Sequence, residues 1–244
     1  SVGVLSAPYH GANVDSVQYF NTLNGNTVSS NVVTEATGAL IGASNYYADA
    51  KGPFGYMSEA AATNICLQSE DFSTTWVVSQ ATITDNTVTS PDGALTGSTL
   101  TATSTAARNR QSALGMAIDT AYVTSVFAKA GVSDWLAIRN LALGGASADQ
   151  QVWFDLSSGS VGTVGSSVTS GTIEDVGGGW YRCSLIATTP SSITNNIVDL
   201  IPAASDGSTT TASTDAIYIW GAQLETGSFP TAYIPTTTVS VTRN

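Results

Sequence analysis

Aromatic rings and charged side chains recur in several segments whose residues alternate between apolar and polar. If the apolar members face a core, a second set faces outward: Phe127, Trp135, Arg139, Trp153, Asp155 and Arg182. Sugar rings have flat faces of C–H groups and rims of hydroxyls, and proteins hold them with aromatic planes and fixed hydrogen-bonding groups. We therefore expect these six residues to gather on one sheet face and to bind carbohydrate.

A plainer interpretation of the same six residues stays open. An outward aromatic face is also what a loop, an N-terminal arm or a second subunit would cover. The apolar hairpins near the N-terminus lack a core of their own, which favours such a cover.

No catalytic group is expected. His10 is the chain's single histidine and lies in a Pro-Gly loop, so a Ser-His-Asp or Cys-His arrangement is unpromising. Glu174 and Asp175 are neighbours on a predicted strand and point to opposite faces, although any two of the 18 acidic residues could in principle converge for glycoside hydrolysis. The glycines 177–179 precede a strand pattern, whereas a phosphate-binding loop precedes a helix. We predict a non-enzymatic protein.

Composition limits the function classes further. The chain has 244 residues, 42% of them hydrophobic and 10% charged, a balance that supports a packed globule. Its net charge of -11 has the wrong sign for binding nucleic acid. Cys66 and Cys183 are far apart and in no metal-binding pattern, so we expect free thiols in the core. No apolar run approaches the roughly 20 residues of a membrane span, and we expect no membrane insertion.

Strands must position the six outward residues, because period-two alternation is common in the sequence and helical periodicity is almost missing. The strongest predicted strands are 122–129, 134–143, 151–156, 180–188, 196–203 and 216–225. Turn signals separate them at 157–160, 175–180 and 205–208. Strands spaced about a dozen residues apart predict an all-β jelly-roll sandwich.

The first 60 residues form a different pattern. Asn24-Gly25 lies between two alternating runs, the strongest short-range hairpin signal, and a Thr37-Gly38 turn follows. We predict an N-terminal β-hairpin arm at 1–60, used for assembly or as a lead-in, and a jelly-roll domain at 61–244.

The order of motifs after residue 60 carries a resemblance. In sequence they are TNICLQSEDFSTTW, PDGALTGSTLTATS, YVTSVFAKAG, VWFDLSSGSVGTV, IEDVGGGWYRCSL and IYIWGAQLETGSFPTAYIPT. This order resembles the carbohydrate-binding-like jelly-roll domain of bacteriophage tail-fibre and head-spike proteins. Cys66 departs from it, since an aliphatic residue is usual there.

The resemblance implies a virion surface protein, assembled in the host bacterial cytoplasm, that attaches to bacterial surface glycans beside other virion proteins. It also implies a homo-oligomer, with a homotrimer favoured. Two alternatives stay open. One is a purely structural or decoration protein whose aromatic face is a subunit interface, and the other is an accessory module of a polysaccharide-degrading enzyme.

The resemblance also implies a possible structural Ca²⁺, which related jelly-roll modules often bind near the first strand and an acid of the last strand. The acids at the corresponding positions are Glu70, Asp71, Asp215 and Glu225. Ca²⁺ takes several oxygen ligands from flexible loops, and these carboxylates would supply them.

The segment 217–237 concentrates rings and prolines, and we predict that it straps the sandwich closed. Ile217, Ile219 and Leu224 would enter the core, while a second set would wrap the edge: Trp220, Phe229, Tyr233, Pro230 and Pro235. After it, residues 237–244 are expected to run to the next subunit or module.

Overall fold

The computed structural model describes residues 61–208 and 210–243, which fall in one unit beginning at Ala60. The predicted hairpin arm at 1–60 lies outside the described residues. The described residues form strands and two short 3₁₀ turns, Leu141–Leu143 and Ser147–Gln150. In this part of the chain no helix is long and apolar enough to cross a membrane.

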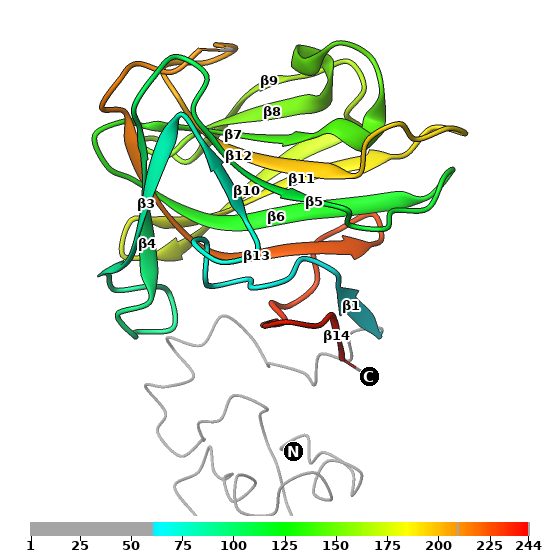
Figure 1. Cartoon of the computed structure of the whole chain (residues 1–244), viewed down its shortest axis with the longest axis horizontal. Coiled ribbons are helices and arrows are strands. Elements are labelled where there is room, and N and C mark those ends of the chain that lie inside the picture. The colour runs from blue at the N-terminus through cyan, green and yellow to red at the C-terminus, as the bar shows by residue number, and fades with distance from the viewer. Residues whose placement is uncertain (1–60, 209, 244) are drawn as a thin grey trace, which may run out of the picture. The chain divides into compact units, whose positions relative to one another are not determined.

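Two six-stranded antiparallel sheets form the two layers of a sandwich (Figure 1). The first, named here the β6 sheet, has the order β10-β11-β6-β13-β4-β3, with bounds Ser170–Gly177, Trp180–Thr188, Ala121–Ala130, Ala216–Thr226, Gly97–Ala102 and Ala81–Val88. The second, the β7 sheet, has the order β2-β5-β12-β7-β8-β9, with bounds Val77–Ser79, Arg108–Ser112, Ile197–Ala203, Trp135–Asn140, Gln151–Asp155 and Ser160–Val164. The prediction of an all-β jelly-roll sandwich is confirmed.

The six predicted strands all exist, as β6, β7, β8, β11, β12 and β13. The main difference is at the end of β7, which stops at Asn140 rather than continuing to 143. There the Asn140 side chain accepts a hydrogen bond from the amide of Ala142 and begins a 3₁₀ turn. This local bond competes with the strand ladder and ends it.

The core lies between the two sheets and contains the residues that the alternation placed inward. Val126 of the β6 sheet and Phe154 of the β7 sheet are both fully buried in it, together with Cys183. Burying a side chain of the size of Phe154 contributes about 1.5–3 kcal/mol. The inward half of the predicted pattern is therefore confirmed.

The C-terminal segment closes the outer face of the β6 sheet. Ile217, Ile219 and Leu224 enter the core as predicted. The rings of Trp220 and Tyr233 lie 4.9 Å apart between centroids, and both pack on Phe127. Phe229, in contrast, is 64% exposed, so its predicted role in wrapping the edge is wrong.

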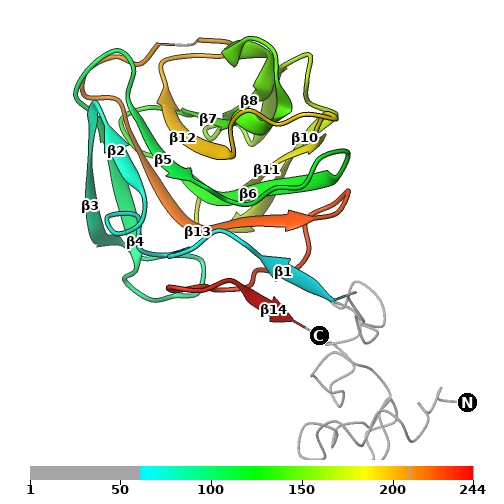
Figure 2. The same ribbon diagram turned by 45° about the vertical axis from the view of Figure 1, so that its right-hand side comes forward.

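Residues 241–243 do not leave the body as expected. They form β14, Val241–Arg243, which pairs antiparallel with β1, Ala62–Asn64, of the same chain (Figure 2). The buried amide of Asn64 fixes this corner. It donates to the carbonyls of Ala222 and Ile234 and accepts from the amides of Cys66 and Leu224. Its hydrogen-bonding capacity is thereby filled.

Candidate functional site

The six predicted carbohydrate-binding residues do not share one sheet face. Phe127 and Arg182 are on β6 and β11, in the β6 sheet. The other four are on β7 and β8, in the β7 sheet: Trp135, Arg139, Trp153 and Asp155. The prediction of a single face is therefore wrong. Alternation separates inward from outward side chains, but it does not say to which of two sheets a strand belongs.

The chain's own C-terminal segment covers Phe127 and Arg182. Each is 8% exposed, and the Arg182 guanidinium lies 5.4 Å from the centroid of the Phe127 ring. Arg182 Nη1 also donates to the carbonyl of Thr231, at 2.6 Å. This pair therefore anchors the segment that follows β13.

Trp153 is covered as well. It is 1% exposed, packs with Ala137 and Ile201, and donates its indole N–H to the Ser208 carbonyl at 2.9 Å. Of the interpretations open from the sequence, a covering loop is the one that the structure gives for this ring.

Trp135 and Asp155 lie opposite each other in the β7–β8 register. Trp135 is partly exposed and its ring lies close to β9, where a Cβ added at Gly162 would be 2.7 Å from it. The Asp155 carboxylate accepts hydrogen bonds from the amides and hydroxyls of Ser157 and Ser158. Partial burial acts to raise the pKa of Asp155, but these hydrogen bonds outweigh it and hold the pKa below its ordinary value. Because Trp153 is buried, Trp135 is the ring on this face that is accessible to a ligand.

A row of three charges crosses the same face. Asp199 on β12 lies opposite Arg110 on β5 and Arg139 on β7. Arg110 donates to the two carboxylate oxygens at 2.6 and 2.8 Å, and Arg139 donates to Oδ2, at 3.0 Å from Nε. We call Arg110, Asp199 and Arg139 the arginine row.

Burial within the arginine row is graded. The Asp199 side chain is fully buried, while those of Arg110 and Arg139 are 25% and 15% exposed. The hydrogen bonds that Arg110 donates to Asp199 raise the pKa of Arg110 above its ordinary value, against the opposing effect of burial. The buried carboxylate thus holds two guanidinium groups at the surface in fixed orientations.

Arg110 and Asp199 were missed by the sequence prediction. A signal was present for both. Residues 108–112 read RNRQS, with two arginines two positions apart, and Asp199 stands between two core residues of a strand that had been predicted, Val198 and Leu200. In both strands the alternation of inward and outward side chains places the charged residues, Arg110 and Asp199, on the outer face. Their pairing could not be predicted, because β5 and β12 are distant in sequence.

The four acids named for Ca²⁺ do not form one site. Among the described residues there is no group of three or more His, Cys, Asp and Glu side chains that could hold a metal ion. Glu70 and Asp71 line a hollow of about 240 Å³, but Asp215 and Glu225 do not. Asp71 accepts from Ser73 and Thr74, Asp215 from the amide of Ala212, and the buried Glu225 from Gln223 and Thr231. These carboxylates are used for local structure.

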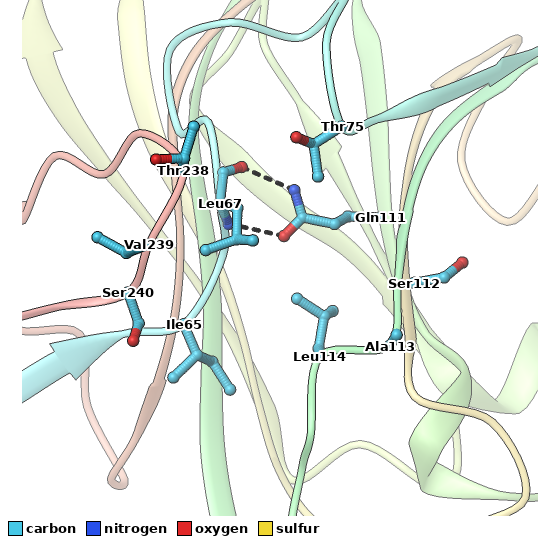
Figure 3. Close-up of a pocket in the computed structure, with 10 residues that line it drawn as sticks. All are labelled: Ile65, Leu67, Thr75, Gln111, Ser112, Ala113, Leu114, Thr238, Val239 and Ser240. Carbon is cyan, nitrogen blue, oxygen red and sulfur yellow. Dashed lines mark hydrogen bonds between the residues drawn. The ribbon is translucent and has the colours of Figure 1, made fainter.

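A second hollow, of about 410 Å³, lies beside the end of β5 (Figure 3). Gln111 spans one side of it, accepting from the Leu67 amide at 2.8 Å and donating to the Leu67 carbonyl at 2.7 Å. Its lining is aliphatic or uncharged: Ile65, Leu67, Thr75, Gln111, Ser112, Ala113, Leu114, Thr238, Val239 and Ser240. It offers no ring and no charged group, so the outer face of the β7 sheet is the stronger candidate.

Comparison with known proteins gives likenesses of fold. No protein-family model and no curated protein matches the chain. A domain of bacteriophage CBA120 tailspike protein 4 is similar at a TM-score of 0.40 and 16% identity, covering 65% of this chain and 20% of that chain. The CBM22-1–GH10 modules of Clostridium thermocellum endo-1,4-β-D-xylanase 10B give 0.39 and 16%, covering 72% and 29%. The CBM22-1 xylan-binding domain from Paenibacillus barcinonensis Xyn10C gives 0.38 and 9%, covering 68% and 92%.

The chain thus spans less than a third of the first two of these structures. Likenesses at this level carry no argument about what the chain binds.

Proposed function

We propose that this chain is a non-catalytic surface component of a phage virion that binds bacterial surface polysaccharide through the outer face of the β7 sheet. The observation that carries the proposal is the placement of the partly exposed Trp135 ring on the same strand as Arg139 of the arginine row. Arg139 is four positions after Trp135 along β7, about 13 Å in an extended strand. A ring and a fixed set of donors at this spacing suit consecutive units of a glycan chain.

The order of sequence motifs supports the virion role, since it resembles that of phage tail-fibre and head-spike domains. The jelly-roll sandwich supports it as a scaffold, because the part of the outer sheet face that the segment after β12 does not cover can hold a ligand. The proposal includes a homotrimeric assembly with other virion proteins, which is the arrangement that the resemblance implies.

The structural alternative is an aromatic face used as a subunit interface. On the β6 sheet the rings of Phe127, Trp220 and Tyr233 already pack on one another, so that face has an occupant within the chain. The interface alternative therefore concerns the same outer face of the β7 sheet. For Trp135→Ala, glycan binding predicts a weaker affinity for the glycan, and a subunit interface predicts loss of the oligomer.

The test is a glycan array of bacterial surface polysaccharides with the full chain, its Trp135→Ala variant and a control variant Phe229→Ala. Phe229 is a more exposed ring outside this face. We expect Trp135→Ala to weaken binding about tenfold or more, because a stacked ring contributes on the order of 1 kcal/mol beyond its buried area, and Phe229→Ala to leave binding unchanged.

Light scattering on the same three proteins separates the alternative. Loss of the oligomer in Trp135→Ala, with no glycan bound by the original chain, would overturn the glycan proposal in favour of a subunit interface.

A further inference from the structure

Positive charge is concentrated on one face of an acidic protein. The chain has seven Lys and Arg against 18 Asp and Glu. Three of the seven, Arg108, Arg110 and Arg139, lie on β5 and β7 of the β7 sheet, which are separated only by β12. By strand alternation Arg108 points to the same side as Arg110. Three guanidiniums and the one carboxylate of Asp199 leave this end of the face with a formal charge of +2.

The guanidinium groups of the arginine row keep donors in reserve. Arg110 and Arg139 each use Nε and Nη2 to bind Asp199. The Nη1 group of each makes no hydrogen bond within the described part of the chain. Each arginine therefore carries an N–H₂ group beyond its bond to Asp199, and a guanidinium donor suits a carboxylate, sulfate or phosphate oxygen better than a neutral hydroxyl.

Two buried donors beside the row lack partners. Gln151, which lies opposite Arg139 in the β7–β8 register, is 1% exposed, and its Nε2 has no hydrogen-bond partner in the described residues. The Nε of Arg108 is likewise buried and has no hydrogen-bond partner in the described residues. A buried donor without a partner is costly, and a bound water or ion that completes its bonding is one explanation for such a group.

Apart from Asp199, two acids of this face, Asp155 and Asp206, lie at its Trp135 end. Asp155 is opposite Trp135, and its carboxylate is occupied by Ser157 and Ser158. Asp206 accepts from the amide and hydroxyl of Thr163. The face thus has a positive end at the arginine row and a ring end at Trp135.

The overall charge of -11 does not cancel this local field. At about 0.1 M salt the Debye length is about 10 Å, so acids elsewhere on the surface are largely screened from a ligand on this face. A contact at about 3 Å from a partly buried guanidinium is screened much less. The local charge therefore decides which ligand is preferred at contact.

We infer that the polysaccharide bound by this face is an acidic one, whose carboxylate or other anionic groups lie on Arg108, Arg110 and Arg139 while a neighbouring sugar ring lies on Trp135. The inference rests on the proposed function and names the chemical class of its ligand.

The experiment compares two polymers of one backbone, polygalacturonate and its methyl ester, by isothermal titration with the full chain. We expect polygalacturonate to bind about tenfold more tightly, since charge-assisted hydrogen bonds to its carboxylates are stronger than neutral ones. The preference should vanish as ionic strength rises toward about 1 M, where the Debye length is about 3 Å.

Two variants locate the preference, and a third is their matched control. Arg110→Gln and Arg108→Gln should each reduce the affinity for polygalacturonate about tenfold and that for the ester by much less, so that the preference for the acid falls. Lys129→Gln removes the same charge from β6, in the other sheet, and should change neither. Arg108 donates to the carbonyl of Ala106 and has no ion pair with Asp199, so it carries the test if Arg110→Gln fails to fold.

The outcomes separate the two proposals. Equal affinity for acid and ester, reduced by Trp135→Ala, overturns the acidic class and keeps the glycan function. Acid-specific binding that is unchanged in both arginine variants overturns the site. Equal binding of a single-stranded DNA overturns the assignment to a glycan, and binding of neither polymer nor of any array glycan overturns the proposed function itself.

Discussion

Trp153 donates its indole N–H to the carbonyl of Ser208. Its ring lies on the outer face of the β7 sheet and yet is only 1% exposed. The segment that follows β12 thus covers part of the outer face, and Asp206 in the same segment binds Thr163 of β9. The outward-facing Trp153 thus forms a small second core with Ala137, Ile201 and Ala203.

Trp153→Ala should therefore act on stability. We expect a loss of about 3–5 kcal/mol in the free energy of unfolding, measured by urea denaturation, because a fully buried ring leaves a cavity. Trp153→Phe keeps most of the ring and loses the bond to Ser208, so it should cost less than the alanine variant. An unfolding free energy unchanged in Trp153→Ala would contradict the burial described for this ring.

The charge balance of the arginine row predicts a second effect. Asp199→Ala leaves Arg110 and Arg139 facing each other across β12 without their shared carboxylate, and we expect it to cost about 3–5 kcal/mol. The control is Asp134→Ala, which removes the same charge from an exposed side chain and should cost less than about 0.5 kcal/mol. Similar midpoints of urea unfolding for the two variants would argue against a buried, shared carboxylate.

The serine hydrogen bonds of Asp155 predict a dependence on pH. Its pKa is lowered in the folded protein, so its contribution to stability is complete above the unfolded pKa, near 3.9, and is lost as pH falls through the folded pKa. We expect the stability difference between the original chain and Asp155→Asn to shrink between about pH 5 and pH 2. Asp155 is partly exposed and solvent screens its hydrogen bonds, so the change is below about 1 kcal/mol. Measurements of both proteins at pH 7 give the effect of the substitution alone, and a difference that grows with acid would refute the sign.

Burial should make both thiols unreactive. It raises the pKa of the Cys66 thiol to about 12 and that of Cys183 well above its ordinary value, so neither forms a thiolate near neutral pH. We expect no reaction with Ellman's reagent in the native protein and the release of two equivalents in denaturant. A cysteine placed at Val132, which is 75% exposed, is the positive control and should react at once. Rapid native labelling without the added cysteine would place a thiol at the surface.

Asn64→Asp keeps the shape of the side chain and removes its two N–H donors. The carbonyls of Ala222 and Ile234 would then face a buried carboxylate, and we expect a loss of about 3 kcal/mol or more. Asn86→Asp, at an exposed position, is the matched control and should cost little. Equal thermal midpoints for the two variants would mean that Asn64 does not hold β1 to β13.

The sequence predicted the strands whose alternation is strong and whose interior residues are apolar. Val126 and Phe154 belong to such strands, and their inward placement was predicted correctly. The strand β3 reads ATITDNTV and alternates between half-buried and exposed residues, so its apolar signal is too weak to predict it. Local pattern is informative where one face is buried, and it weakens at sheet edges.

The candidate site was predicted only in part, for a topological reason. Trp135 and Arg139 were named, but they were combined with Phe127 and Arg182 of the other sheet. Which strands become neighbours depends on contacts between distant segments, as in the pairing of Asp199 with Arg110 and Arg139. The cover over Trp153 likewise comes from a loop more than fifty residues away, as the separation of 55 residues to Ser208 indicates.

The pairing of β1 with β14 has a mechanical consequence. Because the two strands are antiparallel and Ala62 lies opposite Arg243, tension applied through both chain ends would open this pair from one side, one bond at a time, rather than shearing all of it together. The opening would then reach Asn64, three of whose four side-chain hydrogen bonds join β1 to β13 and to Ile234. The side-chain amide of Asn64 would then resist further separation of β1 from the β6 sheet after the β1–β14 pair has opened.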